Sequence, residues 1–229
     1  MKFTEQIRKE VDPIWEASFN HPFVAGLADG TLSMDRFRFY VLQDSYYLSH
    51  FARIQSIAAA QADDLHTISR MASHAVETNR AELSLHKHFF VQLDISEEDI
   101  ASFKPAPSAY AYVSHLYRAA HTGQIGDTVA AILPCYWLYY EIGEKQKHAI
   151  PDEPIYQEWI ATYGGDWFGK LVNEVIQLTD DVAEKVSEAD RERMKENYLI
   201  SSQYEYMFWE MAYRKETWPV DLSSLPTIY

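Results

Sequence analysis

The sequence predicts an all-α fold, a bundle of several helices packed around one core. Apolar side chains recur every three or four residues through most of the chain, and short connections rich in Gly and Pro separate these segments. No segment shows the alternation that is typical of strands. The chain has 229 residues, within the roughly 250 that a single core supports. We therefore expect one helical domain over residues 1–229, with an irregular tail over residues 220–229.

The first part of the chain divides at prolines and glycines. Residues 1–20 carry apolar side chains at helical spacing, with Pro13 as a kink. Residues 26–30 begin and end with glycine, which predicts a short connection or a helical turn. Ser33 is a suitable N-cap for a long helix over residues 34–61, which contains neither Pro nor Gly.

The middle of the chain predicts three more helices. The first covers residues 65–93 and is polar on one side. It contains His86 and His88, which a helix points to different faces, so we interpret both as solvated surface residues rather than a metal site. Ser96 caps a short helix, and another runs from Ser108 towards Gly123.

The last part begins with the helix that carries the cysteine. We expect Asp127 to cap this helix and Gly143, with the prolines after it, to end it. The remaining helices are predicted over residues 155–163, 166–186 and 187–215, the last of them capped by Ser187.

Charge and composition exclude several classes of protein. The net charge of −14 repels phosphate backbones, which excludes nucleic-acid binding. The sequence starts without a basic and then apolar signal region, and a single cysteine cannot form an internal disulfide, so we expect a cytoplasmic protein. No apolar run reaches the roughly 18 residues that a membrane span needs. The 16 Tyr, 11 Phe and 6 Trp residues suit a site for a planar ligand.

The cysteine lies in an aromatic helix directly after a proline. Cys135, Tyr139 and Ile142 are spaced to share one helical face, so a thiol and a phenol would point into one cavity. Pro134 has no backbone N–H and should loosen the helix just before the thiol. The alternative is that Cys135 is a buried and inert apolar residue.

Two carboxylates lie on aromatic faces of other helices. Asp44 falls within an aromatic stripe and shares its face with Tyr47, while Glu205 shares a face with Phe208. Burial would raise the pKa of Glu205 and allow it to act as a general acid. In the alternatives, Asp44 lies at the margin of the stripe and meets water or an Arg, and Glu205 and Glu210 are both solvated.

These side chains suggest covalent hydrolysis without a metal. A thiolate can add to an electron-poor ring carbon once a neighbouring ring nitrogen is protonated, and a glutamic acid of raised pKa can supply that proton. None of the nine histidines has a Glu three residues before it, so the metal ligands of di-iron bundles are missing. We therefore expect no metal and no cofactor.

The same segments resemble thiaminase II, the TenA family, over nearly the whole chain apart from the tail after Pro219. The resemblance implies a haem-oxygenase-like helical fold and a homotetramer. It also implies thiamine salvage, in which 4-amino-5-aminomethyl-2-methylpyrimidine becomes the hydroxymethyl pyrimidine and thiamine is split into pyrimidine and thiazole. The family resemblance rests on the motifs HPF at 21–23, FYVLQDSYYL at 39–48, LPCYWLY at 133–139, the segment 156–163 and YEYMFW at 204–209.

The resemblance also implies a role for individual residues. Cys135 resembles the nucleophile, Glu205 the proton donor to the pyrimidine ring nitrogen, and Tyr47 the residue that raises the reactivity of the cysteine. Asp44 resembles the residue that holds the amino group of the ring. The other side chains similar to substrate-contacting or wall residues are Tyr139, Tyr163, Tyr112 and Phe208.

Two other functions remain open at this point. The first is a pyrimidine-binding or regulatory protein without turnover, since members of this family were first described as affecting the expression of extracellular enzymes. The second is haem or redox chemistry, which is an analogy of fold alone. His21, next to the first helix, precedes a proline and is a poor haem ligand.

Overall fold

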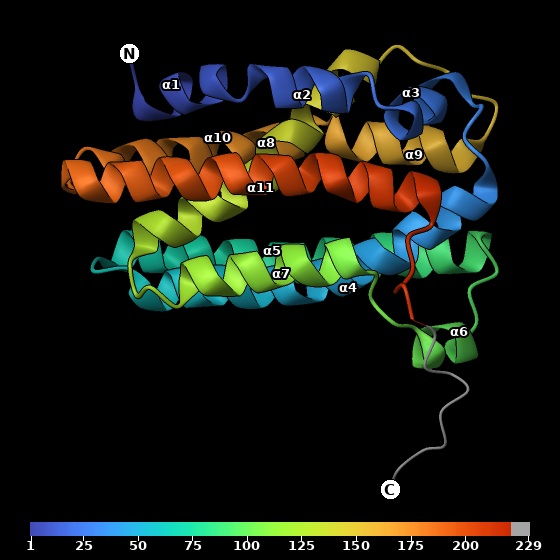
Figure 1. Ribbon diagram of the computed structural model, residues 1–229, viewed down its shortest axis with the longest axis horizontal. Coiled ribbons are helices and arrows are strands. Elements are labelled where there is room, and N and C mark those ends of the chain that lie inside the picture. The colour runs from blue at the N-terminus through green and yellow to red at the C-terminus, as the bar shows by residue number, and fades with distance from the viewer. Residues whose placement is uncertain (221–229) are drawn as a thin grey trace, which may run out of the picture.

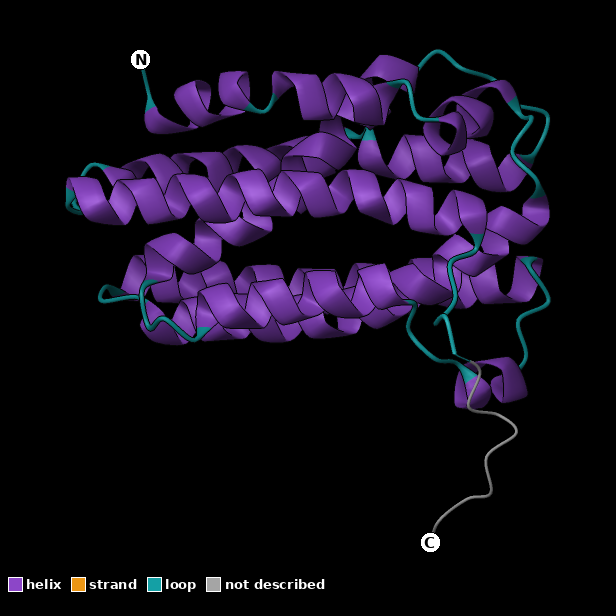
Figure 2. Ribbon diagram, viewed as in Figure 1, coloured by secondary structure: helices purple, strands orange, loops and turns teal. Residues whose placement is uncertain are grey.

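The computed structural model describes residues 1–220, except for the side chains of residues 81–84. The described residues contain eleven α-helices and no strand, so the all-α prediction is confirmed (Figure 2). The tail predicted over residues 220–229 lies, except for Val220, outside the described residues. The helices are α1 (Phe3–Glu10), α2 (Asp12–Phe19), α3 (Pro22–Asp29), α4 (Met34–Gln61), α5 (Leu65–Gln92), α6 (Glu97–Ser102), α7 (Pro107–Ala120), α8 (Ile125–Gln146), α9 (Pro154–Tyr163), α10 (Asp166–Ala183) and α11 (Glu188–Arg214).

Helix α8 lies at the centre of the bundle. Figure 1 shows α4, α5 and α7 on one side of the molecule and α1, α2, α9, α10 and α11 on the other. Helix α8 packs against α4 and α7 from the first group and against α9, α10 and α11 from the second. Its sequence explains this position, because nearly every residue from Gly126 to Leu138 is buried. The helix that carries Cys135 therefore touches both halves of the bundle.

The N-terminal helix is divided, which differs from the prediction of one kinked helix over residues 1–20. Helix α1 ends at Glu10, and α2 begins at Asp12 with Pro13 in its first turn. Pro13 has no N–H to donate to the preceding turn, so the chain restarts a helix instead of bending one. The short connection predicted over residues 26–30 also belongs largely to a helix, α3, which ends at Gly30 with φ of +78°.

Several predicted boundaries are confirmed and others shift. Helix α4 spans 34–61 as predicted, and Ser187 caps α11 in a capping box with Asp190. Helix α10 ends at Ala183, three residues earlier than expected. Helix α8 continues past Gly143 to Gln146.

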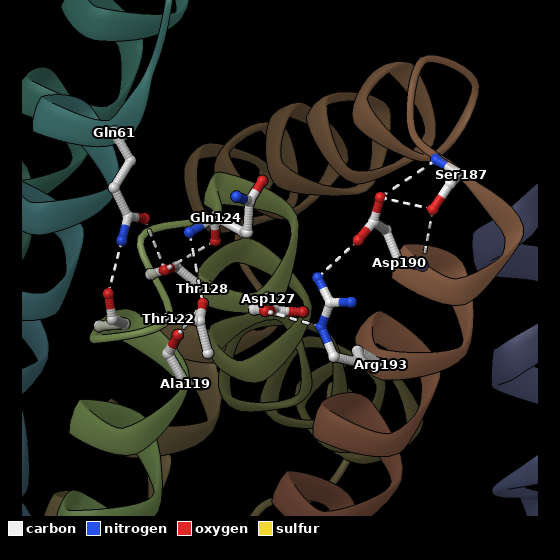
Figure 3. A network of polar contacts seen from close by, with 10 residues as sticks. Gln61, Ala119, Thr122, Gln124, Asp127, Thr128, Ser187, Asp190 and Arg193 are labelled. Atoms are coloured by element: carbon white, nitrogen blue, oxygen red, sulfur yellow. Dashed lines mark hydrogen bonds and ion pairs between the residues drawn. The ribbon is translucent and has the colours of Figure 1, made fainter.

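The prediction that Asp127 caps α8 is wrong. The helix begins at Ile125, and Asp127 is buried within its first turn, where Oδ2 accepts a hydrogen bond from Arg193 Nε at 3.4 Å. Figure 3 shows how Arg193 joins this carboxylate to Asp190. A hydrogen bond from Thr128 Oγ1 to Gln61 Oε1, 2.7 Å long, ties the same end of α8 to α4. Long-range partners thus replace the local cap.

Aromatic side chains form much of the core between α4, α8, α9 and α11. Trp209 of α11 stacks on Phe23 and Tyr40 and lies 5.0 Å, ring centre to ring centre, from Tyr139 of α8. The indole of Trp159 in α9 donates a hydrogen bond to the Tyr40 hydroxyl at 3.3 Å. Large rings bury much apolar area, so this cluster holds the site's helices in place.

None of the described helices is long and apolar enough to cross a membrane.

Replacing Gly143 by alanine is expected to lower the free energy of unfolding by about 3 kcal/mol, the upper end of the usual overpacking cost. A Cβ at Gly143 would collide with the backbone of Tyr163 and Gly164, which lies directly over α8. Thermal unfolding of the variant measures this loss. A variant as stable as the wild type would contradict the close approach of α8 to the end of α9.

Candidate active site

A small cavity lies beside Cys135 between α4, α5, α8, α9 and α10. Its volume is about 60 Å³, below the 300–1,000 Å³ or so of sites for drug-sized ligands. Four residues with a predicted site role line it: Cys135, Asp44, Tyr139 and Tyr163. The rest of the lining is largely apolar and aromatic, from Leu48, Phe51, Thr78, Leu85, Tyr136, Thr162, Trp167, Phe168 and Leu171.

The other predicted residues form a buried group that does not line this cavity. The Tyr47 ring lies 4.9 Å from the Tyr112 ring and 5.8 Å from Phe208, centre to centre. The Tyr112 hydroxyl donates a 2.6 Å hydrogen bond to Glu205 Oε1. The charge of Cys135 contributes to raising the pKa of both Tyr47 and Tyr112, after the larger effect of burial. The thiol, which lines the cavity, therefore also interacts electrostatically with this group.

Glu205 is buried, with 1% of its surface exposed. Burial raises its pKa to about 8, although the hydrogen bond from Tyr112 opposes this by stabilising the carboxylate. The alternative of two solvated glutamates is therefore wrong for Glu205. Glu210 does reach the surface, where it contacts His21 Nε2 at 3.0 Å. A carboxyl with this pKa carries a proton for much of the time at neutral pH, which is what a general acid requires.

Asp44 is buried at the cavity and paired with a histidine. Its Oδ2 lies 3.3 Å from His86 Nε2, and both side chains are buried. The alternative of Asp44 at a solvated margin is wrong, and so is the interpretation of His86 as a surface residue. His88 is exposed as predicted. The i, i+2 spacing places the two histidines on different faces of their helix. It does not predict which residues of other helices contact either of them.

Tyr139 and Tyr163 form an aromatic wall of the cavity. Their ring centres are 4.9 Å apart, and Tyr163 also lies 4.6 Å from Trp159 and 5.2 Å from Phe168. Burial raises the pKa of Tyr139 well above its ordinary value, so its hydroxyl keeps its proton and can donate it in a hydrogen bond.

Tyr136 and its partners were not predicted from the sequence to belong to the site. Tyr136 follows Cys135 directly and lines the cavity, and its hydroxyl contacts His74 and Gln55. Gln55 carried a weak signal, because it is a polar residue one turn after Phe51 on the buried face of α4. The link to His74 has no signal in the sequence, since the two residues are 62 positions apart.

Other sites are less suited to chemistry. A larger hollow of about 900 Å³ beside α4 and residues 216–220 contains none of the predicted site residues. In the part of the chain that the structure describes, no three His, Cys, Asp or Glu side chains gather closely enough to hold a metal ion. Both ring nitrogens of His21 are engaged, one by the Phe23 N–H and one by Glu210.

Tyr112→Phe is expected to move the alkaline limb of kcat/KM to higher pH. The substitution removes the donor that stabilises the Glu205 carboxylate, so the pKa of Glu205 should rise above about 8. A pH profile of kcat/KM measures the shift. Tyr204→Phe is the matched control, because that ring stacks on Tyr112 with centres 5.3 Å apart. An alkaline limb that does not move would show that it does not report Glu205.

The chain is similar to known proteins over nearly its whole length. The chain is 58% identical, over 95% of its length and 92% of the relative's, to the aminopyrimidine aminohydrolase of Bacillus subtilis (strain 168). Its structure superposes with a TM-score of 0.86 on the TenA homologue from P. horikoshii OT3, at 29% identity over 93% of this chain and 99% of that one. A protein from Shewanella denitrificans OS217 described as having a heme oxygenase-like fold superposes with a TM-score of 0.73 at 18% identity, covering 93% of this chain and 92% of that one, which shows the fold alone.

A family model also matches the chain. The TENA/THI-4/PQQC family model covers residues 8–215, nearly all of the described chain. The resemblance seen in the sequence motifs and the predicted haem-oxygenase-like fold are therefore both confirmed. The chain belongs to the TENA/THI-4/PQQC family.

Proposed function

We propose that this protein hydrolyses aminopyrimidines in thiamine salvage, with Cys135 as the nucleophile and Glu205 as the acid. The substrates would be 4-amino-5-aminomethyl-2-methylpyrimidine and thiamine. The observation that carries the proposal is the buried carboxyl of Glu205, which has a pKa of about 8. It accepts a hydrogen bond from Tyr112, and Tyr112 in turn interacts electrostatically with Cys135. The name aminopyrimidine aminohydrolase, borne by the Bacillus subtilis relative, supports the same reaction class.

The proposed reaction exchanges an amine for a hydroxyl group through a covalent intermediate. Glu205 does not line the cavity, so the bound ring would have to extend beyond it to reach this carboxyl. Glu205 then protonates a pyrimidine ring nitrogen, which makes the ring electron-poor, and the Cys135 thiolate adds to a ring carbon. The bond between the exocyclic methylene carbon and its nitrogen then breaks, so that an ammonium group leaves as ammonia and the thiazolium of thiamine leaves as neutral thiazole. Water adds at this methylene carbon and loses a proton to solvent, the C–S bond breaks, and the ring nitrogen returns its proton to Glu205. One water is consumed, and one ammonia or thiazole and one proton are released.

The remaining predicted residues would bind and orient the ring. Asp44, held by His86, would accept a hydrogen bond from the 4-amino group. Tyr139 and Tyr163 offer flat aromatic faces and hydroxyl groups on the cavity wall. Tyr47 packs between Tyr112 and Phe208, and its buried hydroxyl would act on the thiol, with which it interacts electrostatically.

The experiment that tests this function is hydrolysis of the aminomethyl pyrimidine and of thiamine in ¹⁸O-labelled water with a chelator present. We expect each product pyrimidine to carry one ¹⁸O in its new hydroxyl group, and the rate to be unaffected by the chelator. Comparing the two rates ranks the substrates. Tight binding of the pyrimidine by well-folded protein without turnover would reject the enzyme and leave a pyrimidine-binding protein.

The homotetramer implied by the family resemblance and the cytoplasmic location expected from the sequence stay proposals. Light scattering of the purified protein at micromolar concentration tests the first of them, with a mass of four chains as the expected result.

A further inference from the structure

A chain of polar contacts leads from the cavity wall to the protein surface. The Tyr136 hydroxyl lies 2.9 Å from His74 Nδ1, and His74 Nε2 lies 3.2 Å from Glu174 Oε2. Tyr136 and His74 are buried, whereas Glu174 is about half exposed. Together the hydroxyl, the imidazole and the carboxylate link three helices, α8, α5 and α10.

The amide of Gln55 determines the direction of these hydrogen bonds. Its Nε2 group donates to the Tyr136 hydroxyl oxygen, and also to Thr78 Oγ1 at 2.9 Å. The phenolic proton is then left for His74 Nδ1, so His74 is neutral and its Nε2–H points to Glu174. Burial lowers the pKa of His74, which favours this neutral form. The hydrogen bonds that Tyr136 makes with Gln55 and His74 are therefore consistent in direction.

The backbone near Cys135 needs such a support. Pro134 leaves the carbonyl of Ala130 without its usual helical donor, so the helix is less restrained one residue before the thiol. Tyr136 follows the thiol, and its ring is held by Phe51 and Phe168 at centre distances of 5.4 and 6.2 Å. Its hydroxyl is the point where this part of α8 is tied to α4, α5 and, through Glu174, α10.

We propose that Tyr136 is a positioning residue for Cys135, and that His74 and Glu174 act through Tyr136 by fixing its hydroxyl. The inference rests on the proposed function, since it assumes that the placement of the thiol limits catalysis. A thiol that moves by about 1 Å can lose up to about 10²-fold in rate. The pyrimidine ring itself would still be bound by Asp44, Tyr139 and Tyr163. Loss of the support should therefore lower kcat and leave KM nearly unchanged.

A double-mutant cycle tests whether His74 acts through Tyr136. We expect Tyr136→Phe to lower kcat by about 10-fold, with KM changed by less than about 2-fold. His74→Leu should have a similar effect, and the double variant should be no worse than Tyr136→Phe alone. His74→Asn should recover much of the rate, because its amide oxygen can take the place of Nδ1 as acceptor. This last variant also serves if the leucine variant folds poorly.

The chain offers a matched control pair. His50 Nδ1 lies 3.0 Å from the Tyr117 hydroxyl, which joins α4 to α7, and neither residue lines the cavity. His50→Gln and Tyr117→Phe should leave kcat unchanged. The inference would be overturned if the double variant lost kcat by the product of the two single losses. It would also be overturned if KM rose while kcat stayed constant.

A second readout does not depend on turnover. Cys135 is the only cysteine, so its rate of alkylation by iodoacetamide can be followed cleanly in each variant. We expect the rate to change on Tyr136→Phe and His74→Leu, with no further change in the double variant. If the wild type fails to hydrolyse aminopyrimidines, the proposed function is lost, but this measurement still reports on the support of the thiol. Equal alkylation rates in all these proteins would overturn the inference alone.

Discussion

Replacing Cys135 by serine is expected to lower kcat for aminopyrimidine hydrolysis by a factor of about 10⁴ or more, the scale seen when an enzyme loses its nucleophile. A serine hydroxyl is almost wholly protonated near neutral pH and cannot replace a thiolate in addition to a ring carbon. Because serine is close to cysteine in size, the fold should be kept. Steady-state kinetics with mass spectrometry of the products, together with thermal unfolding, measures both expectations.

Two controls accompany this prediction. Cys135→Ala removes any nucleophile at the position and should be as inactive as the serine variant. Both variants should still bind the pyrimidine, because Asp44, Tyr139 and Tyr163 remain on the cavity wall. Turnover by either variant above about a tenth of the wild-type rate would reject the covalent mechanism. Loss of binding together with turnover would instead indicate a damaged cavity.

Replacing Glu205 by glutamine is expected to lower kcat/KM by about 10² to 10⁴, the usual range for a general acid. Glutamine fills the same space and can still accept the Tyr112 hydrogen bond, but it has no proton to give to the ring nitrogen. The alkaline limb near pH 8 that belongs to Glu205 should also disappear from the pH profile. Glu196→Gln, an exposed position on the same helix, is the matched control and should change neither value.

The same substitution makes a separate prediction for stability. Burial raises the pKa of Glu205 in the folded protein from 4.5 to about 8, so between these values the folded state binds more protons than the unfolded state. The stability contributed by this group is full below pH 4.5 and is lost as the pH rises through about 8. The Gln variant should lack this loss. Equal pH dependence of unfolding in wild type and variant would contradict the raised pKa.

The helices were predicted well because their signals are local. The three- and four-residue periodicity of α4, and the Ser187 cap of α11, depend only on neighbouring residues. The errors arose where distant partners compete with local ones. Asp127 would cap α8 in isolation, but Arg193 of α11 pairs with it instead. The prediction that His86 is a surface residue was wrong for the same reason, because Asp44 of another helix contacts it.

Helical periodicity predicts an all-α bundle with one thiol and two carboxylates on aromatic helix faces, because it tells which residues share a face. The family resemblance lies in short sequence motifs. Which of these faces meet depends instead on the packing of the whole bundle. Tyr112 and Glu205, 93 residues apart, become a hydrogen-bonded pair, and Tyr136 reaches His74 across 62 residues. The chemistry depends on these contacts because burial and hydrogen bonding shift a pKa, and both belong to the packed bundle rather than to any single helix.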